Sequence, residues 1–229
     1  QRVKKPIRLV FSVYSNMIYR LFEYEFESLD DYSSIKLIKE KNYSLQDTDI
    51  SPEELLEVYQ KTQVKTDDDM RYTDIPFIQA DKFERVISLL EQLHDNSLTT
   101  EEIAEMMQFE LRQSDYYFNA GRYLGLFEKV VDDNKGTIVV QLTSLGKQVF
   151  KLNYKERQLK LVELILEHKI FHDLFKDVYD KKELLPREYV KNKMREYNVC
   201  GESVVHRRSS SVLGWLKWIF NLPKVSNKQ

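Results

Sequence analysis

Two short stretches of the chain carry side chains of the types that bind phosphates and base edges. In the first, between residues 111 and 123, two arginines, a glutamine, an asparagine and a serine stand among aromatic residues. Arginine donates paired hydrogen bonds to guanine, asparagine and glutamine pair with adenine, and serine binds phosphate. These types also occur on ordinary solvated helix faces, so that alternative stays open. The candidate residues are Arg112, Gln113, Ser114, Asn119 and Arg122.

The second stretch covers residues 203–218 and begins with a basic and hydroxyl-rich segment. Free amides at a helix N-terminus, guanidinium groups and hydroxyls together favour a phosphate, although a capped surface pair of arginines is the plainer interpretation. Trp215 and Trp218 stand three positions apart, and we expect both in the core. The candidate residues here are His206, Arg207, Arg208, Ser209, Ser210 and Ser211.

Enzyme motifs are incomplete, so the sequence leaves open whether the chain is an enzyme. The pair His168 and His172 lacks the context of a zinc protease site, and we expect a structural role for it. There is no glycine-rich phosphate loop and no nucleophile elbow. Glutamates at 23, 25 and 27 offer nuclease residue types without the acid-x-Lys spacing. We expect no cofactor, except Mg²⁺ if residues 1–76 form a nuclease piece.

The net charge of −2 hides an uneven distribution. Residues 1–150 hold 18 basic against 27 acidic side chains, and residues 151–229 hold 17 against 10. The basic C-terminal third favours a polyanionic partner. Cys200 is the single cysteine, which fits a reducing compartment, and no apolar run approaches the roughly 20 residues of a membrane span. We therefore expect a cytoplasmic protein with no membrane partner.

The elements that position these side chains can be predicted from periodicity. From Ile78 onward the apolar spacing is helical, and a helix, a short helix from Thr100, a third helix, and a hairpin over residues 127–142 follow one another. That order is typical of a winged helix, with Lys135 at the wing tip as a further candidate for contact with DNA. A second helical unit follows over residues 151–222, with helices predicted at 155–168, 170–179, 186–196 and 203–220.

The N-terminal region is different in character. β-branched and aromatic residues predict strands at 7–14 and 18–26, with a further short strand near 35–38, and Ser51-Pro52-Glu53-Glu54 starts a helix that runs to about Gln63. An acidic loop over residues 65–74 then marks the boundary. We expect a mainly α fold with small β content (α+β), divided into a β-containing region 1–76, a winged-helix domain 77–150, a second helical domain 151–222 and a disordered tail 223–229.

The stretch from Asp81 to Phe220 resembles a tandem winged-helix region of prokaryotic restriction-modification proteins, including type II restriction enzymes. The likeness rests on residues 98–104 (LTTEEIA), 112–117 (RQSDYY) with 120–126, Leu142-Thr143, and the closing HRRSSSVLGWLKWI at 206–219. It implies modules that recognise DNA for a nuclease, which lies either upstream in the same polypeptide or in a partner subunit.

We therefore expect sequence-specific binding of double-stranded DNA, as the recognition part of a type II restriction system. A protein-docking winged helix and a transcriptional regulator are alternatives, since fold alone does not establish DNA binding. A complete restriction nuclease with its catalytic piece in residues 1–76 is a second alternative. A homodimer is compatible with each of these.

Overall fold

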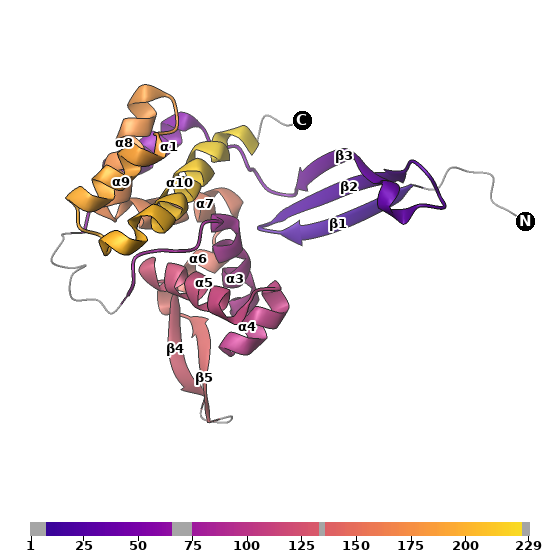
Figure 1. The fold of residues 1–229 in the computed structure, drawn as a ribbon, viewed down its shortest axis with the longest axis horizontal. Helices are drawn as coiled ribbons and strands as arrows, with labels where there is room; N and C mark the ends of the chain where they lie inside the picture. The colour runs from indigo at the N-terminus through magenta and orange to yellow at the C-terminus, as the bar shows by residue number, and fades with distance from the viewer. Residues whose placement is uncertain (1–7, 66–74, 133–135, 226–229) are drawn as a thin grey trace, which may run out of the picture.

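The computed structural model describes residues 8–65, 75–132 and 136–225. These form a mainly α-helical body with small β content, from which a three-stranded sheet projects (Figure 1). The α+β class predicted from the sequence is therefore confirmed. No helix in these ranges is long and apolar enough to cross a membrane.

The projecting sheet is an antiparallel meander in the order β1-β2-β3, built from β1 (Leu9–Ser15), β2 (Ile18–Phe26) and β3 (Ile35–Ser44). The first two strands meet at the predicted place. Asn16 and Met17 both have positive φ, 50° and 60°, as the tight turn of a two-residue hairpin requires. The third strand is longer than the short stretch predicted, and a 3-10 helix at Tyr32–Ser34 precedes it.

The turn between β1 and β2 fastens the sheet to the body. The amide of Asn16 donates to both carboxylate oxygens of Glu91, at 2.9 and 3.0 Å, and Gln158 donates to the side-chain oxygen of Asn16 at 2.9 Å. Glu91 also lies 3.4 Å from the guanidinium of Arg157, which is 1% exposed. Loss of Glu91 would leave the buried cation of Arg157 uncompensated, so these contacts stabilise the junction between the sheet and the helical body.

The helix α1 (Pro52–Lys61) begins with the predicted cap. Ser51 accepts from the amide of Glu54, whose side chain accepts in return from the amide of Ser51. The helix packs on α7 (Tyr154–Leu166), and Tyr59 stacks on Phe175 of α8 (Lys169–Lys181) with ring centroids 5.2 Å apart. It therefore belongs to the helical body in space, although it was grouped with the N-terminal region by sequence.

Residues 77–150 follow the predicted order of elements. They comprise α3 (Phe83–Asp95), α4 (Thr100–Met107), α5 (Leu111–Tyr123), the hairpin β4 (Phe127–Asp132) and β5 (Thr137–Leu142), and α6 (Ser144–Lys151). Between α3 and α4, Leu98 exchanges two backbone hydrogen bonds with Val140 of β5, at 3.0 and 2.7 Å. An isolated β-bridge at Leu98 thus adjoins the two-stranded hairpin. Thr143 caps α6 as predicted.

Residues 151–225 form the predicted helices α7 and α8, followed by α9 (Arg187–Glu196) and α10 (Glu202–Val225). The last helix is longer than expected. It includes residues 223–225, which had been assigned to a disordered tail, whereas residues 226–229 lie outside the described ranges. Of the acidic loop predicted at 65–74, the structure describes only Lys65, which forms an isolated parallel β-bridge with His168.

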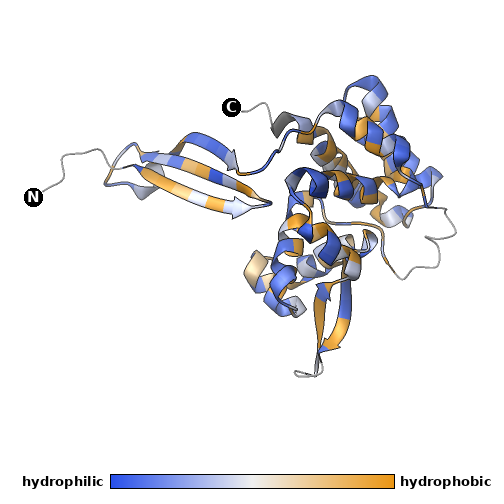
Figure 2. Cartoon of the chain, turned by 180° about the vertical axis from the view of Figure 1, so that it is seen from behind, coloured by the Kyte–Doolittle hydropathy of each residue, from blue (hydrophilic) through white to orange (hydrophobic). Residues whose placement is uncertain are grey.

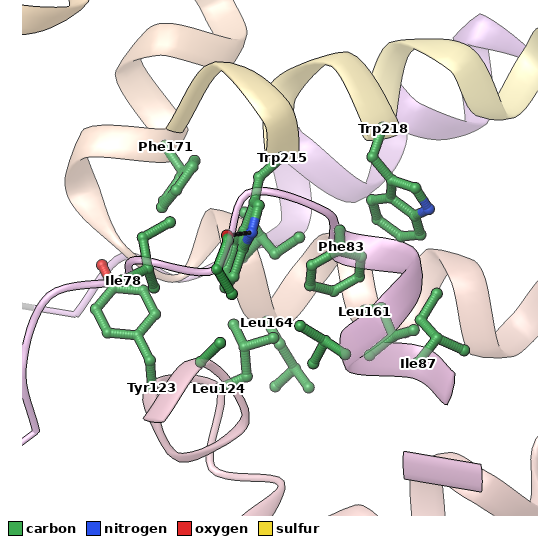
Figure 3. Close-up of a cluster of buried hydrophobic side chains, with 14 of the residues drawn as sticks. Ile78, Phe83, Ile87, Tyr123, Leu124, Leu161, Leu164, Phe171, Trp215 and Trp218 are labelled. Carbon is green, nitrogen blue, oxygen red and sulfur yellow. Dashed lines mark hydrogen bonds between the residues drawn. The ribbon is translucent and has the colours of Figure 1, made fainter. Parts of the chain in front are cut away.

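One hydrophobic core connects both predicted units (Figure 3). Trp215 of α10 is fully buried, contacts Phe83 of α3 edge to face at 4.8 Å, and stacks on Phe171 of α8 at 5.5 Å. Its indole N–H donates to the carbonyl of Ala80 at 2.8 Å. At Gly214 any Cβ would meet the carbonyl oxygen of Asp81 at 2.2 Å, so a glycine is needed where α10 crosses this segment. The core role predicted for Trp215 and Trp218 is confirmed.

Candidate nucleic-acid interface

The structure brings the two candidate stretches together in one groove of about 410 Å³. Its walls come from the N-terminal turns of α5 and α10, and its floor from the segment that leads into α3. An arginine at the start of α9 completes it. The lining residues are Gln79, Ala80, Asp81, Gln113, Tyr116, Tyr117, Arg187, His206, Arg207, Ser210 and Ser211.

Arg187 is held in place by α10. Its Nε donates to the hydroxyl of Ser209 at 2.9 Å, and its terminal nitrogen donates to the hydroxyl of Ser210 at 2.7 Å and to the carbonyl of His206. The guanidinium is nevertheless exposed, and no carboxylate in the described ranges pairs with it. A fixed, unneutralised guanidinium presents donors to an anion at little entropic cost.

Unpaired arginines are the common feature of this face. Arg187 and Arg207, which line the groove, and the nearby Arg112 and Arg208 make no ion pair within the described chain. Arg195, near the C-terminus of α9, instead pairs with Glu202 at 2.8 Å. Burial lowers the pKa of Arg208, and the neighbouring Arg207 acts in the same direction. Like charges that lie close together without carboxylates are stabilised by a polyanion.

On α5 the predicted residues differ in exposure. Arg112 and Gln113 are exposed at the first turn, and the Arg112 guanidinium lies 5.5 Å from the centroid of the Tyr116 ring. Asn119 and Arg122 are half-buried further along, and Arg122 lies 5.6 Å from the Phe118 ring. Gln113 also closes the capping box of α5, since its side-chain oxygen accepts from the amide of Glu110 at 3.1 Å, so its amide nitrogen is the part of the side chain that remains available.

Three of the predicted contact residues are corrected by their burial. Ser114 is fully buried on the inner face of α5, and Ser209 and Ser211 are buried on α10. A side chain inside the protein cannot reach a groove of DNA. Ser209 instead donates to the carbonyl of His206 at 2.7 Å and accepts from Arg187, so it orients the arginine. Ser210 is half-buried and stays on the groove wall, and Lys135 lies outside the described residues.

Six of the eleven lining residues are not among the predicted contact residues, and two of these six, Arg187 and Asp81, carry a charge. Arg187 directly follows Pro186, where the sequence predicts a helix start. A basic residue at that position, ahead of the basic segment of the next helix, was the signal that could have indicated its role. Asp81 contributes a carboxylate to the groove floor, where the hydroxyl of Tyr117 lies 3.5 Å away. Burial and the charge of Asp81 raise the pKa of Tyr117 to about 12, so this hydroxyl stays protonated.

The acidic residues of the sheet do not gather into a metal site. Glu27 pairs with Lys36, and Glu23 lies 3.4 Å from Arg8. Asp31 caps the 3-10 helix by accepting from Ser33, which lowers its pKa. Within the described ranges no group of three or more histidine, cysteine, aspartate or glutamate side chains is arranged to hold a metal ion.

Comparison with known proteins yields two families. Residues 85–224 match a family described as a domain of unknown function (DUF7226), and residues 1–44 match a second one, also described as a domain of unknown function (DUF6997). No curated protein and no solved structure matches the chain. The first match runs from α3 into α10 and so spans both helical units, whereas the second coincides with the sheet.

Proposed function

The chain belongs to the family described as a domain of unknown function (DUF7226), and from the geometry of its helical body we propose that this body binds double-stranded DNA sequence-specifically. The observation that carries this proposal is the groove in which Gln113, Arg187 and Arg207 line one surface without a neutralising carboxylate on either arginine. Arginine binds phosphate and guanine, and glutamine reads adenine, so the groove combines backbone contacts with base contacts.

The order of elements supports a winged-helix interpretation of residues 77–150. A helix, an isolated β-bridge at Leu98, two helices and a hairpin occur in that order, and the third helix of such a domain enters the major groove. We assign that role to α5. In the second unit α8, α9 and α10 repeat the three helices without a hairpin, and α10 takes the corresponding place. The N-terminal part of α5 and the second and third turns of α10 line the same groove.

We further propose that this DNA-binding body serves a type II restriction system as its recognition part. The resemblance of residues 81–220 to tandem winged-helix regions of restriction-modification proteins supports this assignment. Catalysis is then the task of another domain or of a partner subunit. A transcriptional regulator would use the same groove, and the two uses differ in whether cleavage accompanies binding.

Selection from a random duplex pool tests the proposal. The chain is incubated with the pool at several salt concentrations, with and without Mg²⁺, and the retained DNA is sequenced. We expect one short motif to be enriched and its affinity to fall steeply with salt. Retention without a motif would refute sequence specificity, and no retention at 50 mM salt would refute DNA binding.

Variants locate the interface on that selected site. Arg207→Ala should weaken all sequences alike and reduce the slope of log K against log salt by about 0.9, because one phosphate contact is lost. Lys217→Ala is the matched control, since Lys217 is an exposed cation further along α10 that does not line the groove. Gln113→Ala should instead relax base preference at one position with little change in the salt slope. Equal effects of Arg207→Ala and Lys217→Ala would place the interface elsewhere.

A further inference from the structure

A second cavity, of about 480 Å³, lies where the C-terminus of α5 meets the N-terminus of α8. Its size is within the range of small-molecule sites. It lies toward the opposite end of α5 from the groove, since Tyr123 lines the cavity and Gln113 to Tyr117 line the groove, a separation along the helix of about 9–15 Å at roughly 1.5 Å per residue. The residues that line it are Lys65, Ile75, Phe77, Tyr123, His168, Lys169, Ile170, Tyr197, Asn198 and Val199.

His168 presents an unsatisfied acceptor at this cavity. Its Nε2 is 3.0 Å from the carbonyl oxygen of Tyr123, and because a carbonyl only accepts, Nε2 carries the proton. Burial lowers the pKa of His168 to about 3, so the ring is neutral at pH 7 and Nδ1 has a free lone pair. Nδ1 is buried and has no partner within the described residues. A buried acceptor left alone is destabilising, and a ligand N–H that bonds to it would remove that cost.

The walls of the cavity suit a flat ring. Tyr123 stacks on His168 with ring centroids 3.7 Å apart and an angle of 13° between the planes. Phe77 meets Tyr123 edge to face at 5.8 Å, and Tyr197 lines the other side. Aromatic and aliphatic walls with one polar acceptor are typical of sites that bind heteroaromatic rings.

The mouth of the cavity carries an unneutralised cation beside a helix N-terminus. Lys169 is exposed, pairs with no carboxylate in the described chain, and holds its ammonium 5.3 Å from the centroid of the Tyr197 ring. The neighbouring Lys65 is already paired with Glu167 at 2.6 Å. His168, the cap residue of α8, makes no side-chain cap, and the amides of Phe171 and His172 already bond to its carbonyl, so the amides of Lys169 and Ile170 are the ones left for an anion.

We propose that this cavity binds a free nucleoside monophosphate. Its base lies against Tyr197, the half-buried ring of the wall, and donates a ring N–H or amino hydrogen to Nδ1 of His168. Its phosphate lies at Lys169 and the N-terminus of α8. The donor of the base matches the acceptor Nδ1 of His168, its flat ring matches the aromatic wall, and the phosphate matches the cation at the mouth of the cavity. The inference does not depend on DNA binding by the groove.

Calorimetry on the full chain with AMP, GMP, CMP and UMP tests this site. At least one of the four should bind with a dissociation constant below about 1 mM. The nucleoside that corresponds to the best nucleotide and ribose 5-phosphate should each bind at least about tenfold more weakly than that nucleotide, because the nucleoside lacks the phosphate and ribose 5-phosphate lacks the base. Equal binding of ribose 5-phosphate, or no binding by any of the four nucleotides, would overturn the proposal.

Nitrogen-15 NMR of the histidines reports the acceptor directly. The Nδ1 resonance of His168 should shift upfield on addition of the nucleotide, as an unprotonated ring nitrogen does when it accepts a hydrogen bond. It is assigned as the signal that survives in the variants His94→Asn, His172→Asn and His206→Asn. An unchanged Nδ1 resonance at saturation would mean that the ligand binds elsewhere.

Two variants separate the parts of the site without touching the buried histidine. Lys169→Ala should weaken the nucleotide about five- to tenfold and leave the nucleoside unchanged, whereas Lys176→Ala, an exposed lysine of the same helix that pairs with Asp180, should change neither. Val199→Trp fills the cavity from its half-buried wall and should abolish binding. Undiminished binding by Val199→Trp would refute the location. If DNA carrying 2-aminopurine changes its fluorescence on binding while no free nucleotide binds, the cavity holds a base of DNA and the proposal of a free nucleotide is wrong.

Discussion

The helical body and the projecting sheet leave opposite kinds of side chain unpartnered. The body buries its apolar residues in one core and leaves arginines such as Arg187 and Arg207 without carboxylates. The sheet pairs charges, as in Glu27 with Lys36, but exposes apolar side chains such as Val10 and Phe11. Figure 2 shows hydrophobic segments, in orange, along its strands. The outer part of one face of the sheet is apolar, since the register places Phe11 opposite Phe22 and Leu9 opposite Tyr24, with Leu37 beyond. The inner end of the same face carries Arg20 and Glu40, which line a pocket with Trp218 of α10.

The difference shows how each region obtains its stability. Folding of the body is driven by burial of apolar surface, and its remaining cations are free for an external anion. The sheet is held by strand pairing and by the joint at Asn16, and contributes little to the shared core beyond Ile18. A change that matters in one region should therefore be nearly silent in the other.

The most direct way to break this comparison is truncation of one large aromatic residue in each region. Trp215→Ala should lower the free energy of unfolding by about 3–5 kcal/mol, because it empties the centre of the core and loses the bond to Ala80. Phe11→Ala, at a side chain already 52% exposed, should cost less than about 1 kcal/mol. Urea denaturation measures both. Similar losses would mean that the sheet also has a core.

Acid should weaken the body through His168. Its pKa is about 3 when folded against 6.5 for a free histidine, so between these values the unfolded chain binds more protons and stability falls as the pH falls. We expect a loss of about 2 kcal/mol between pH 7 and pH 5 that is attributable to this group. His168→Phe should remove that part of the pH dependence when the two unfolding curves are compared. An identical slope in the variant would contradict a buried neutral histidine.

Removing the single carboxylate from the groove floor should sharpen the cationic character of the body. Asp81→Asn should raise affinity for DNA of any sequence by about two- to fivefold, because repulsion between Asp81 and phosphate is lost. Fluorescence anisotropy with the selected duplex and with a scrambled duplex measures the gain. Glu84→Gln, an exposed acid on α3 outside the groove, is the control. A fall in affinity would instead assign Asp81 to a base contact.

The smallest expected effect on stability lies on the sheet. Phe11→Glu should reduce the fluorescence of 8-anilinonaphthalene-1-sulfonate bound to the protein, since it places a charge on the apolar part of the sheet. The free energy of unfolding of the body should stay within about 0.5 kcal/mol of the parent. Ser12→Glu alters the opposite face at the next position and should leave the dye signal unchanged. Equal loss of dye binding in both variants would show that the dye binds elsewhere.

Much of the local structure could be predicted because its signals are local. The stripe of Phe83, Val86, Ile87, Leu90 and Leu93 marks a buried helix face, and all five are buried. Caps at Ser51, Thr99 and Thr143 form as their sequences indicate. Helix ends and strand lengths were less certain, as β3 and α10 show, because pairing and packing extend elements beyond their sequence signals.

The composition of the groove could be predicted only in part. The candidate helices were identified, but their convergence depends on tertiary packing that no local spacing encodes. The burial of Ser114 could have been predicted from its helical spacing. Ser114 lies on the same inner face of α5 as Tyr117, Phe118 and Gly121, but its polar side chain indicated the surface. Ser211 likewise precedes Trp215 and Trp218 on one stripe. A small polar residue on an apolar stripe should be assigned to the core first.

The bond from the Trp215 indole to the carbonyl of Ala80 joins positions that the ribosome produces far apart in time. Until α10 has left the exit tunnel, Phe83 and Phe171 have no tryptophan between them and the surface that α10 covers is open to water. The body therefore completes its folding only after synthesis of α10, and nascent chains that end before it should be captured by chaperones or degraded.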